Sequence, residues 1–66
     1  MIFKLVTNKL WYEIHCAEDP NAPCTNVHGH ERYSNIPATF TDYNYASRVF
    51  EFLVEGGDPF EFFTLN

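Results

Sequence analysis

The chain has 66 residues, a net charge of -5 and an aromatic content of 18%. This length predicts one domain with a thin hydrophobic core. Only four Lys and Arg stand against nine Asp and Glu, which excludes the basic patch of a protein that binds nucleic acid directly. The sequence contains no run of about 18 apolar residues, so it predicts no membrane-spanning helix. The N-terminus lacks the pattern of a signal peptide, so we expect a cytoplasmic protein with reduced cysteines.

Residues 1–16 predict a β-hairpin. Two runs rich in β-branched and aromatic residues, 2–7 and 10–16, are separated only by Asn8-Lys9, which suits a two-residue turn. That register places Lys4 opposite Glu13, and opposite charges across two strands attract. Alternation then separates an apolar inner face (Phe3, Leu5, Tyr12, Ile14) from an outer face that carries Ile2, Val6 and Trp11.

Residues 17–38 show no periodicity and contain three prolines, which predicts a long loop. Its expected anchors on the rest of the domain are Arg32, Tyr33 and Ile36. This loop and the strand before it contain thiol and imidazole groups in the pattern C-x7-C-x3-H-x-H, and these are the groups that zinc prefers. The spacing differs from that of common zinc motifs. The alternative is one buried cysteine, one loop cysteine and two solvated histidines. The candidate zinc ligands are Cys16, Cys24, His28 and His30.

Residues 41–56 predict the single helix of the chain. Thr41 is the expected N-cap, and Phe40 with Tyr45 has the spacing of a hydrophobic staple. Gly56 and Gly57 are expected to end the helix. Apolar residues recur at steps of three and four on one face, which we expect to pack on the sheet: Tyr43, Ala46, Val49, Phe50 and Leu53. Tyr45 and Phe52 fall on the flank of that face.

Residues 59–65 predict a final strand, which we pair antiparallel with the first strand. The predicted fold is therefore a small α+β domain, ββαβ, with strand order 2-1-3 and one helix on one face. Phe63 would then join Val6 and Trp11 on the outer face. The sheet carries more apolar side chains than one helix covers, which predicts a surface for a protein partner or for self-association.

Catalysis is not expected, because the sequence contains no catalytic motif and a domain this small offers little room for a pocket. The sequence instead predicts a small acidic protein-binding module, an inhibitor or adaptor that occupies a surface of a larger partner. In size, acidity and aromatic content it resembles the accessory proteins with which phages block host enzymes or defence complexes, although no motif carries this likeness. The alternatives are a zinc-stabilised mini-domain and a homodimeric structural protein.

The expected partner is a larger protein, and one candidate class is proteins that bind nucleic acid. Acidic side chains can occupy a groove that such a protein uses for phosphates. The expected partner-binding residues combine the outer sheet face, the flank of the helix and the acidic residues near its end. They are Trp11, Val6, Phe63, Tyr45, Phe52, Glu51, Glu55 and Asp58.

Overall fold

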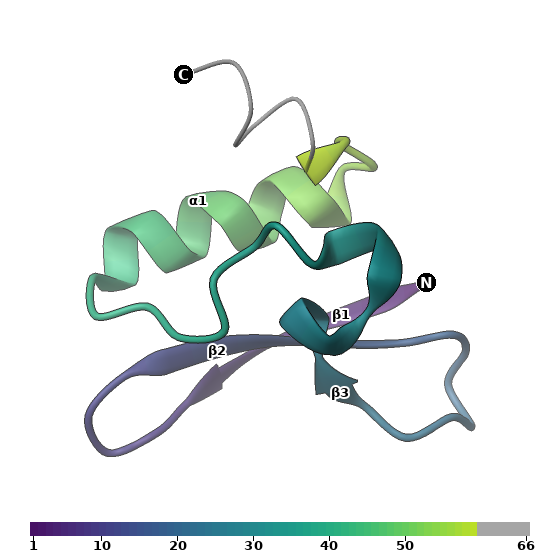
Figure 1. The fold of residues 1–66 in the computed structure, drawn as a ribbon, viewed down its shortest axis with the longest axis horizontal. Helices are drawn as coiled ribbons and strands as arrows, with labels where there is room; N and C mark the ends of the chain where they lie inside the picture. The colour runs from purple at the N-terminus through teal and green to yellow at the C-terminus, as the bar shows by residue number, and fades with distance from the viewer. Residues whose placement is uncertain (60–66) are drawn as a thin grey trace.

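A three-stranded antiparallel sheet lies against one α-helix in the computed structural model, which describes residues 1–59 (Figure 1). The strands are β1 (Ile2–Thr7), β2 (Tyr12–Ala17) and β3 (Thr25–Asn26), and the helix is α1 (Tyr43–Val54). Two 3₁₀ turns, η1 (Val27–Gly29) and η2 (Glu31–Tyr33), come between β3 and α1. The predicted α+β class, with three antiparallel strands and one helix, is confirmed.

The third strand of the described sheet differs from the predicted one. It is β3, which pairs with β2, so the order is β1-β2-β3 rather than 2-1-3. A turn brings the chain back beside β2, with the Ala22 amide donating to the Asp19 carbonyl at 3.1 Å. The predicted strand over residues 59–65 lies, apart from Pro59, outside the described residues.

The hairpin register is shifted by two residues from the predicted one. Thr7 pairs with Tyr12, so residues 8–11 form the loop, and the Asn8 amide donates to the Trp11 carbonyl at 2.8 Å. A shift of two residues leaves every side chain on its predicted face, so the predicted inner face is confirmed. The predicted Lys4–Glu13 pair is wrong, because Lys4 lies opposite His15.

The helix begins one residue later than predicted. Its N-cap is Asp42, whose side chain accepts from the Asn44 amide at 3.0 Å, and a carboxylate is a stronger cap than a threonine hydroxyl. The helix ends before the glycine pair, as predicted: its last residue is Val54, its C-cap is Glu55, and Gly56 follows with φ of +88°. The amides of Gly56 and Gly57 donate to the carbonyls of Leu53 and Phe52, the pattern of a Schellman motif.

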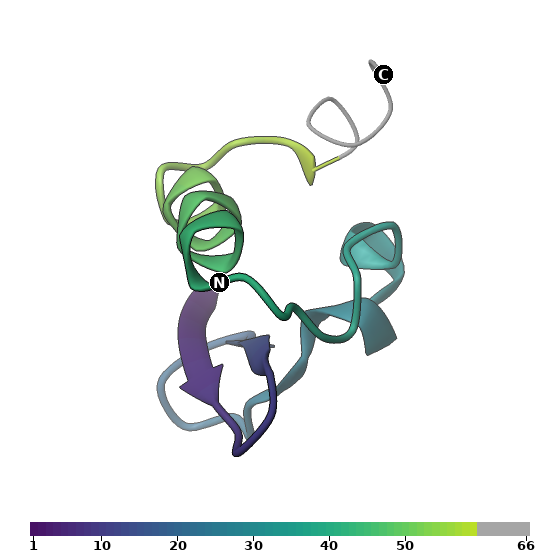
Figure 2. The same cartoon turned by 90° about the vertical axis from the view of Figure 1, so that its left-hand side faces the viewer.

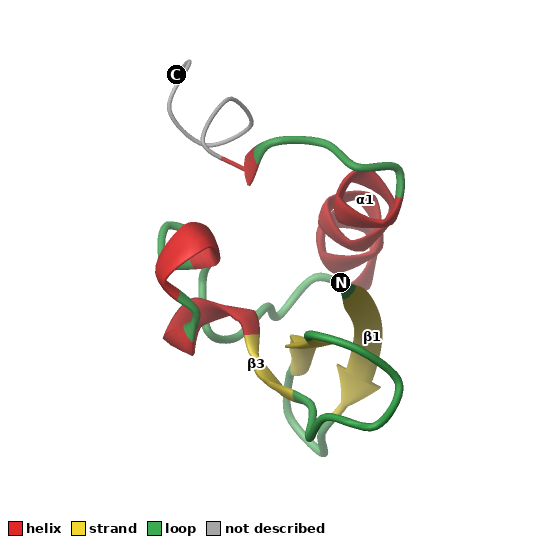
Figure 3. Cartoon of the chain, turned by 90° about the vertical axis from the view of Figure 1, so that its right-hand side faces the viewer, coloured by secondary structure: helices red, strands yellow, loops and turns green. Residues whose placement is uncertain are grey.

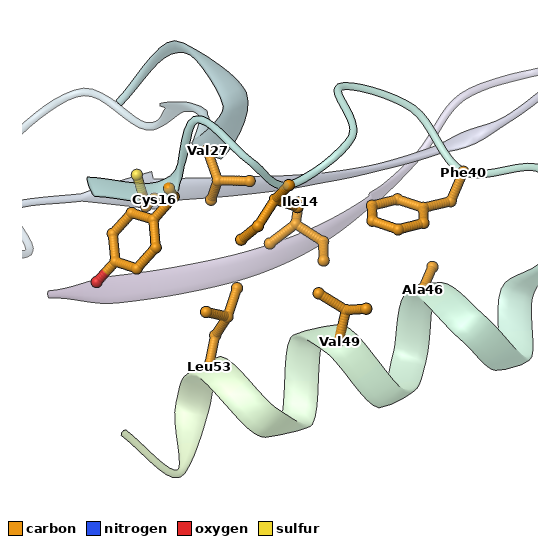
Figure 4. Close-up of a cluster of buried hydrophobic side chains, with 9 residues drawn as sticks. Ile14, Cys16, Val27, Phe40, Ala46, Val49 and Leu53 are labelled. Carbon is orange, nitrogen blue, oxygen red and sulfur yellow. The ribbon is translucent and has the colours of Figure 1, made fainter. Parts of the chain in front are cut away.

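The core lies between the inner sheet face, α1 and a second wall, of which the sequence predicts only Tyr33 and Ile36 as anchors (Figure 4). That wall, which we call the η segment (residues 27–36), belongs to the predicted loop 17–38. It buries Val27, Tyr33 and Ile36. Figures 2 and 3 show α1 and the η segment side by side on the same side of the sheet. Three buried residues of α1 complete the core: Ala46, Val49 and Leu53.

Candidate functional site

The face of the sheet away from α1 is not covered by any helix of residues 1–59 (Figure 1). We call this face the outer sheet surface. Its side chains come from alternate positions of the three strands, and all of them except Ala17 are at least partly exposed. The outer sheet surface consists of Ile2, Lys4 and Val6 of β1, Glu13, His15 and Ala17 of β2 with Trp11 just before that strand, and Asn26 of β3.

The centre of the outer sheet surface is organised by the carboxylate of Glu13. The Trp11 indole donates to Oε2 at 2.6 Å, and His15 Nε2 donates to Oε1 at 2.9 Å. Both donors lie two positions from Glu13 along the chain, so they share its face of the sheet. The bond from His15 and then the bond from Trp11 hold the pKa of Glu13 below its usual value. The Trp11 ring is therefore fixed on the surface by a charge-assisted hydrogen bond.

Asn26 connects this centre to the second wall of the core. Its side-chain amide donates to the Ala38 carbonyl at 2.8 Å, and it lies 3.5 Å from Glu13 Oε1. Its side-chain oxygen accepts from the His28 amide at the start of η1. The position of the η segment and the position of the Glu13 carboxylate are thus linked through one residue.

One end of the outer sheet surface is hollowed. The hollow has a volume of about 410 Å³. Its wall is the turn after β2, which also buries Ala17. The predicted long loop therefore covers this end of the surface but leaves the end at Trp11 half-exposed. The residues that line the hollow are Ile2, Lys4, Ala17, Asp19, Pro20, Ala22 and Cys24.

The predicted binding residues on the helix lie away from the outer sheet surface, because α1 packs on the other side of the sheet. Glu51, Glu55 and Asp58 are exposed near the end of α1. Phe52 is half-buried, and its ring lies so close to Gly57 that a Cβ atom there would be 2.5 Å away. Phe63 lies outside the described residues. The predicted set is thus divided between at least two surfaces.

A third exposed region lies at the hairpin end of α1. Tyr43, predicted to be on the packed face, is 53% exposed, and its ring meets that of Tyr12 with centroids 5.4 Å apart. Tyr45 is 41% exposed and contacts Phe40 with centroids 5.5 Å apart, which confirms the predicted contact between those two rings. Leu10, at the hairpin loop, is also exposed.

The four predicted zinc ligands do not form one group: Cys24 is a half-buried free thiol at the hollow, and the other three have separate surroundings. Cys16 is buried in the core, and this burial raises the pKa of its thiol. His28 Nδ1 donates to the Ile36 carbonyl at 2.7 Å, and His30 Nδ1 accepts from the Arg32 amide at 3.1 Å. Within residues 1–59, no three His, Cys, Asp or Glu side chains are grouped as metal ligands, so the residues as placed do not fit a zinc site.

Sequence reasoning identified Trp11 and Val6 but missed Glu13, His15 and Asn26. The signal was present in the alternation Trp11-x-Glu13-x-His15, which places an indole, a carboxylate and an imidazole on one face of a strand. Asn26 and the hollow could not be found, because both depend on where the turn after β2 returns the chain.

Comparison with known proteins adds no relative. No protein-family model, curated protein or solved structure matches the chain. No helix in the described part of the chain has the length and apolar character needed to cross a membrane. Residues 1–59 thus form a small α+β domain in which α1 packs on one face of the sheet and no described helix covers the other.

Proposed function

We propose that the protein is a small acidic protein-binding module, an inhibitor or adaptor that occupies a surface of a larger partner through its outer sheet surface. The observation that supports this proposal is the position of Trp11. The indole is half-buried on the sheet face that no helix of residues 1–59 covers, and Glu13 fixes it there by a 2.6 Å hydrogen bond. Tryptophan is among the residues that contribute most to protein–protein binding.

Fixing the indole before binding favours tight association. A side chain held in one rotamer loses little conformational freedom when a partner covers it. Val6 lies opposite Glu13 on the neighbouring strand and gives the same surface an apolar contact. The polar groups around Trp11 are already hydrogen-bonded to one another, so covering them leaves few groups without partners. No catalytic role is proposed.

The test is purification of a tagged chain from extracts of its native cells, with Trp11→Ala compared with Tyr43→Ala. The control removes an exposed aromatic side chain from the other side of the sheet. We expect one partner in stoichiometric amount with the wild type and the control, and its loss with Trp11→Ala. Circular dichroism would establish that both variants are folded. A partner that Trp11→Ala retains and Tyr43→Ala loses would overturn the assignment of the surface.

We also propose that the partner itself binds nucleic acid. The acidic side chains near the end of α1 support this second proposal. Glu51, Glu55 and Asp58 are exposed on a side that the outer sheet surface does not use. Replacing these three with Gln or Asn should weaken partner binding and reduce its dependence on salt, because exposed charges are screened. Unchanged affinity and salt dependence would remove phosphate mimicry from the proposal.

A further inference from the structure

The hollow beside Lys4 has the character of a binding site for one apolar side chain. Its volume of about 410 Å³ lies in the range of sites for small ligands, about 300–1,000 Å³. Ile2, Ala17, Pro20 and Ala22 give it apolar lining. The turn that forms its wall is held by two hydrogen bonds, since Asp19 accepts from the amides of Asn21 and Ala22. The hollow is therefore formed before anything enters it.

Two opposite charges lie at the hollow, Lys4 and Asp19, and they do not form an ion pair with each other. The structure gives the Lys4 ammonium group neither a hydrogen bond nor an ion pair within residues 1–59, and His15 rather than a carboxylate lies opposite it. Glu13 is already engaged by Trp11 and His15. Asp19 accepts from the Asn21 amide, but a neutral donor leaves its negative charge in place, so Asp19 opposes the binding of an anion. Lys4 is thus the group of this hollow that can pair with an anion.

We infer that the hollow binds the C-terminal residue of the partner chain, whose apolar side chain enters the hollow while its carboxylate meets Lys4. This inference rests on the proposed function. Ile2 and Lys4 are two positions apart on one face of β1, which separates them by roughly 7 Å. A terminal residue carries an apolar side chain and a carboxylate together, so one residue spans both groups. An acidic side chain within a chain would need a second residue for the apolar contact.

The test uses short peptides and the ¹H–¹⁵N spectrum of the whole chain. Acetyl-Gly-Gly-Leu with a free carboxylate is titrated, and its C-terminal amide is the matched control. The free acid should shift the signals of Ile2, Lys4 and Ala17. Because the ion pair is partly exposed, the amide should bind only about two- to fivefold more weakly at low salt. A third peptide, acetyl-Gly-Leu-Glu-Gly-amide, presents a carboxylate within a chain.

Two substitutions at the rim should act in opposite directions on the free acid. Lys4→Met keeps the length of the side chain and should abolish the difference between acid and amide. Asp19→Asn can keep the turn, because an amide oxygen can also accept from the Asn21 amide. It should strengthen binding of the free acid by removing a repelling charge. Opposite signs for two variants of one hollow would not result from a general loss of folding.

The inference is overturned if the three signals do not move at millimolar peptide, or if acid and amide bind equally to the wild type. It is also overturned if the peptide with an internal carboxylate binds more tightly than the free acid. Each of these results leaves the proposed function intact if Trp11→Ala still loses the partner. Loss of the proposed function itself would appear instead as a partner that Trp11→Ala retains.

Discussion

The two faces of β2 show how one strand serves two purposes. Ile14 and Cys16 point to the inner face and are 0% and 2% exposed, beneath α1 and the η segment. Glu13 and His15, the residues that alternate with them, keep 20% and 24% of their side chains exposed and are hydrogen-bonded to each other. The inner face stabilises the fold by excluding water. The outer face is satisfied by its own hydrogen bonds, so it can be exposed or covered at little cost.

This difference separates stability from binding. Substitutions on the inner face should lower the free energy of unfolding, because they remove apolar contacts that nothing replaces. Substitutions on the outer sheet surface should change partner binding more than folding. A 66-residue chain gains from this division, since a small core leaves little stability to spare.

Ile36→Ala should have the largest effect on stability. Ile36 is 0% exposed although it lies in the η segment, and truncating such a side chain costs about 2–5 kcal/mol. Chemical denaturation measures the loss. Because a variant this weak can fail to fold, Ile36→Val gives a second value, expected at about 0.5–1.5 kcal/mol. The exposed neighbour Thr39→Ala is the control. Equal stabilities for Ile36→Ala and the control would mean that the η segment does not pack into the hydrophobic core.

Gly56→Ala should have the next largest effect. Gly56 has φ of +88°, and a residue with a Cβ atom in this conformation costs about 1–2 kcal/mol. The matched control is Gly29→Ala, because no atom lies within 4 Å of the Cβ position there and its φ lies outside the left-handed range. Thermal unfolding of the two variants should differ clearly. If Gly29→Ala unfolded at a lower temperature than Gly56→Ala, the left-handed conformation of Gly56 would not be important for the stability of the fold.

Asp42→Ala should cost about 1 kcal/mol, the usual effect of removing an N-cap. Its carboxylate accepts from the Asn44 amide at 3.0 Å. Thr41→Ala is the control, since Thr41 is exposed and precedes the cap. Urea unfolding of both variants decides between the cap expected from sequence and the cap in the structure. A larger loss with Thr41→Ala would restore the sequence prediction.

The sequence predicted well wherever a local pattern determines the structure. The apolar period of α1, its glycine stop and the alternation of the hairpin all depend on residues within a few positions of one another. These gave the inner face correctly, with Ile14 and Val49 among the fully buried residues. The register of the hairpin was wrong by two residues because the faces are the same in either register, so hydrophobicity alone could not distinguish them.

The sequence predicts Tyr33 and Ile36 as anchors of the loop, but the path of the η segment and the position of the hollow could not be predicted, because both depend on contacts between distant parts of the chain. Val27 and Ile36 are buried beneath a helix that comes later in the sequence, and no period within residues 17–38 marks them. Asn26 reaches Ala38 across the segment. The candidate site was half predicted: the place of Trp11 on the outer face followed from alternation, but the hydrogen bonds around it depend on the positions of Glu13 and His15 in three dimensions.

Glu13→Gln should have the smallest effect on stability, and its dependence on pH distinguishes the two faces. The pKa of Glu13 is held below its ordinary 4.5 by the bonds from His15 and Trp11. A lowered pKa in the folded state means that the ionised carboxylate stabilises the fold above the ordinary value, and that this contribution is lost as pH falls through the lowered one. The wild type should therefore exceed Glu13→Gln in stability at pH 7, and the gap should close in acid. Glu55→Gln, at an exposed carboxylate beyond α1, serves as the control in the same series of denaturation curves. A gap that stays constant from pH 7 to acid would mean that the outer face is held by packing, and that Trp11 does not depend on the charge of Glu13.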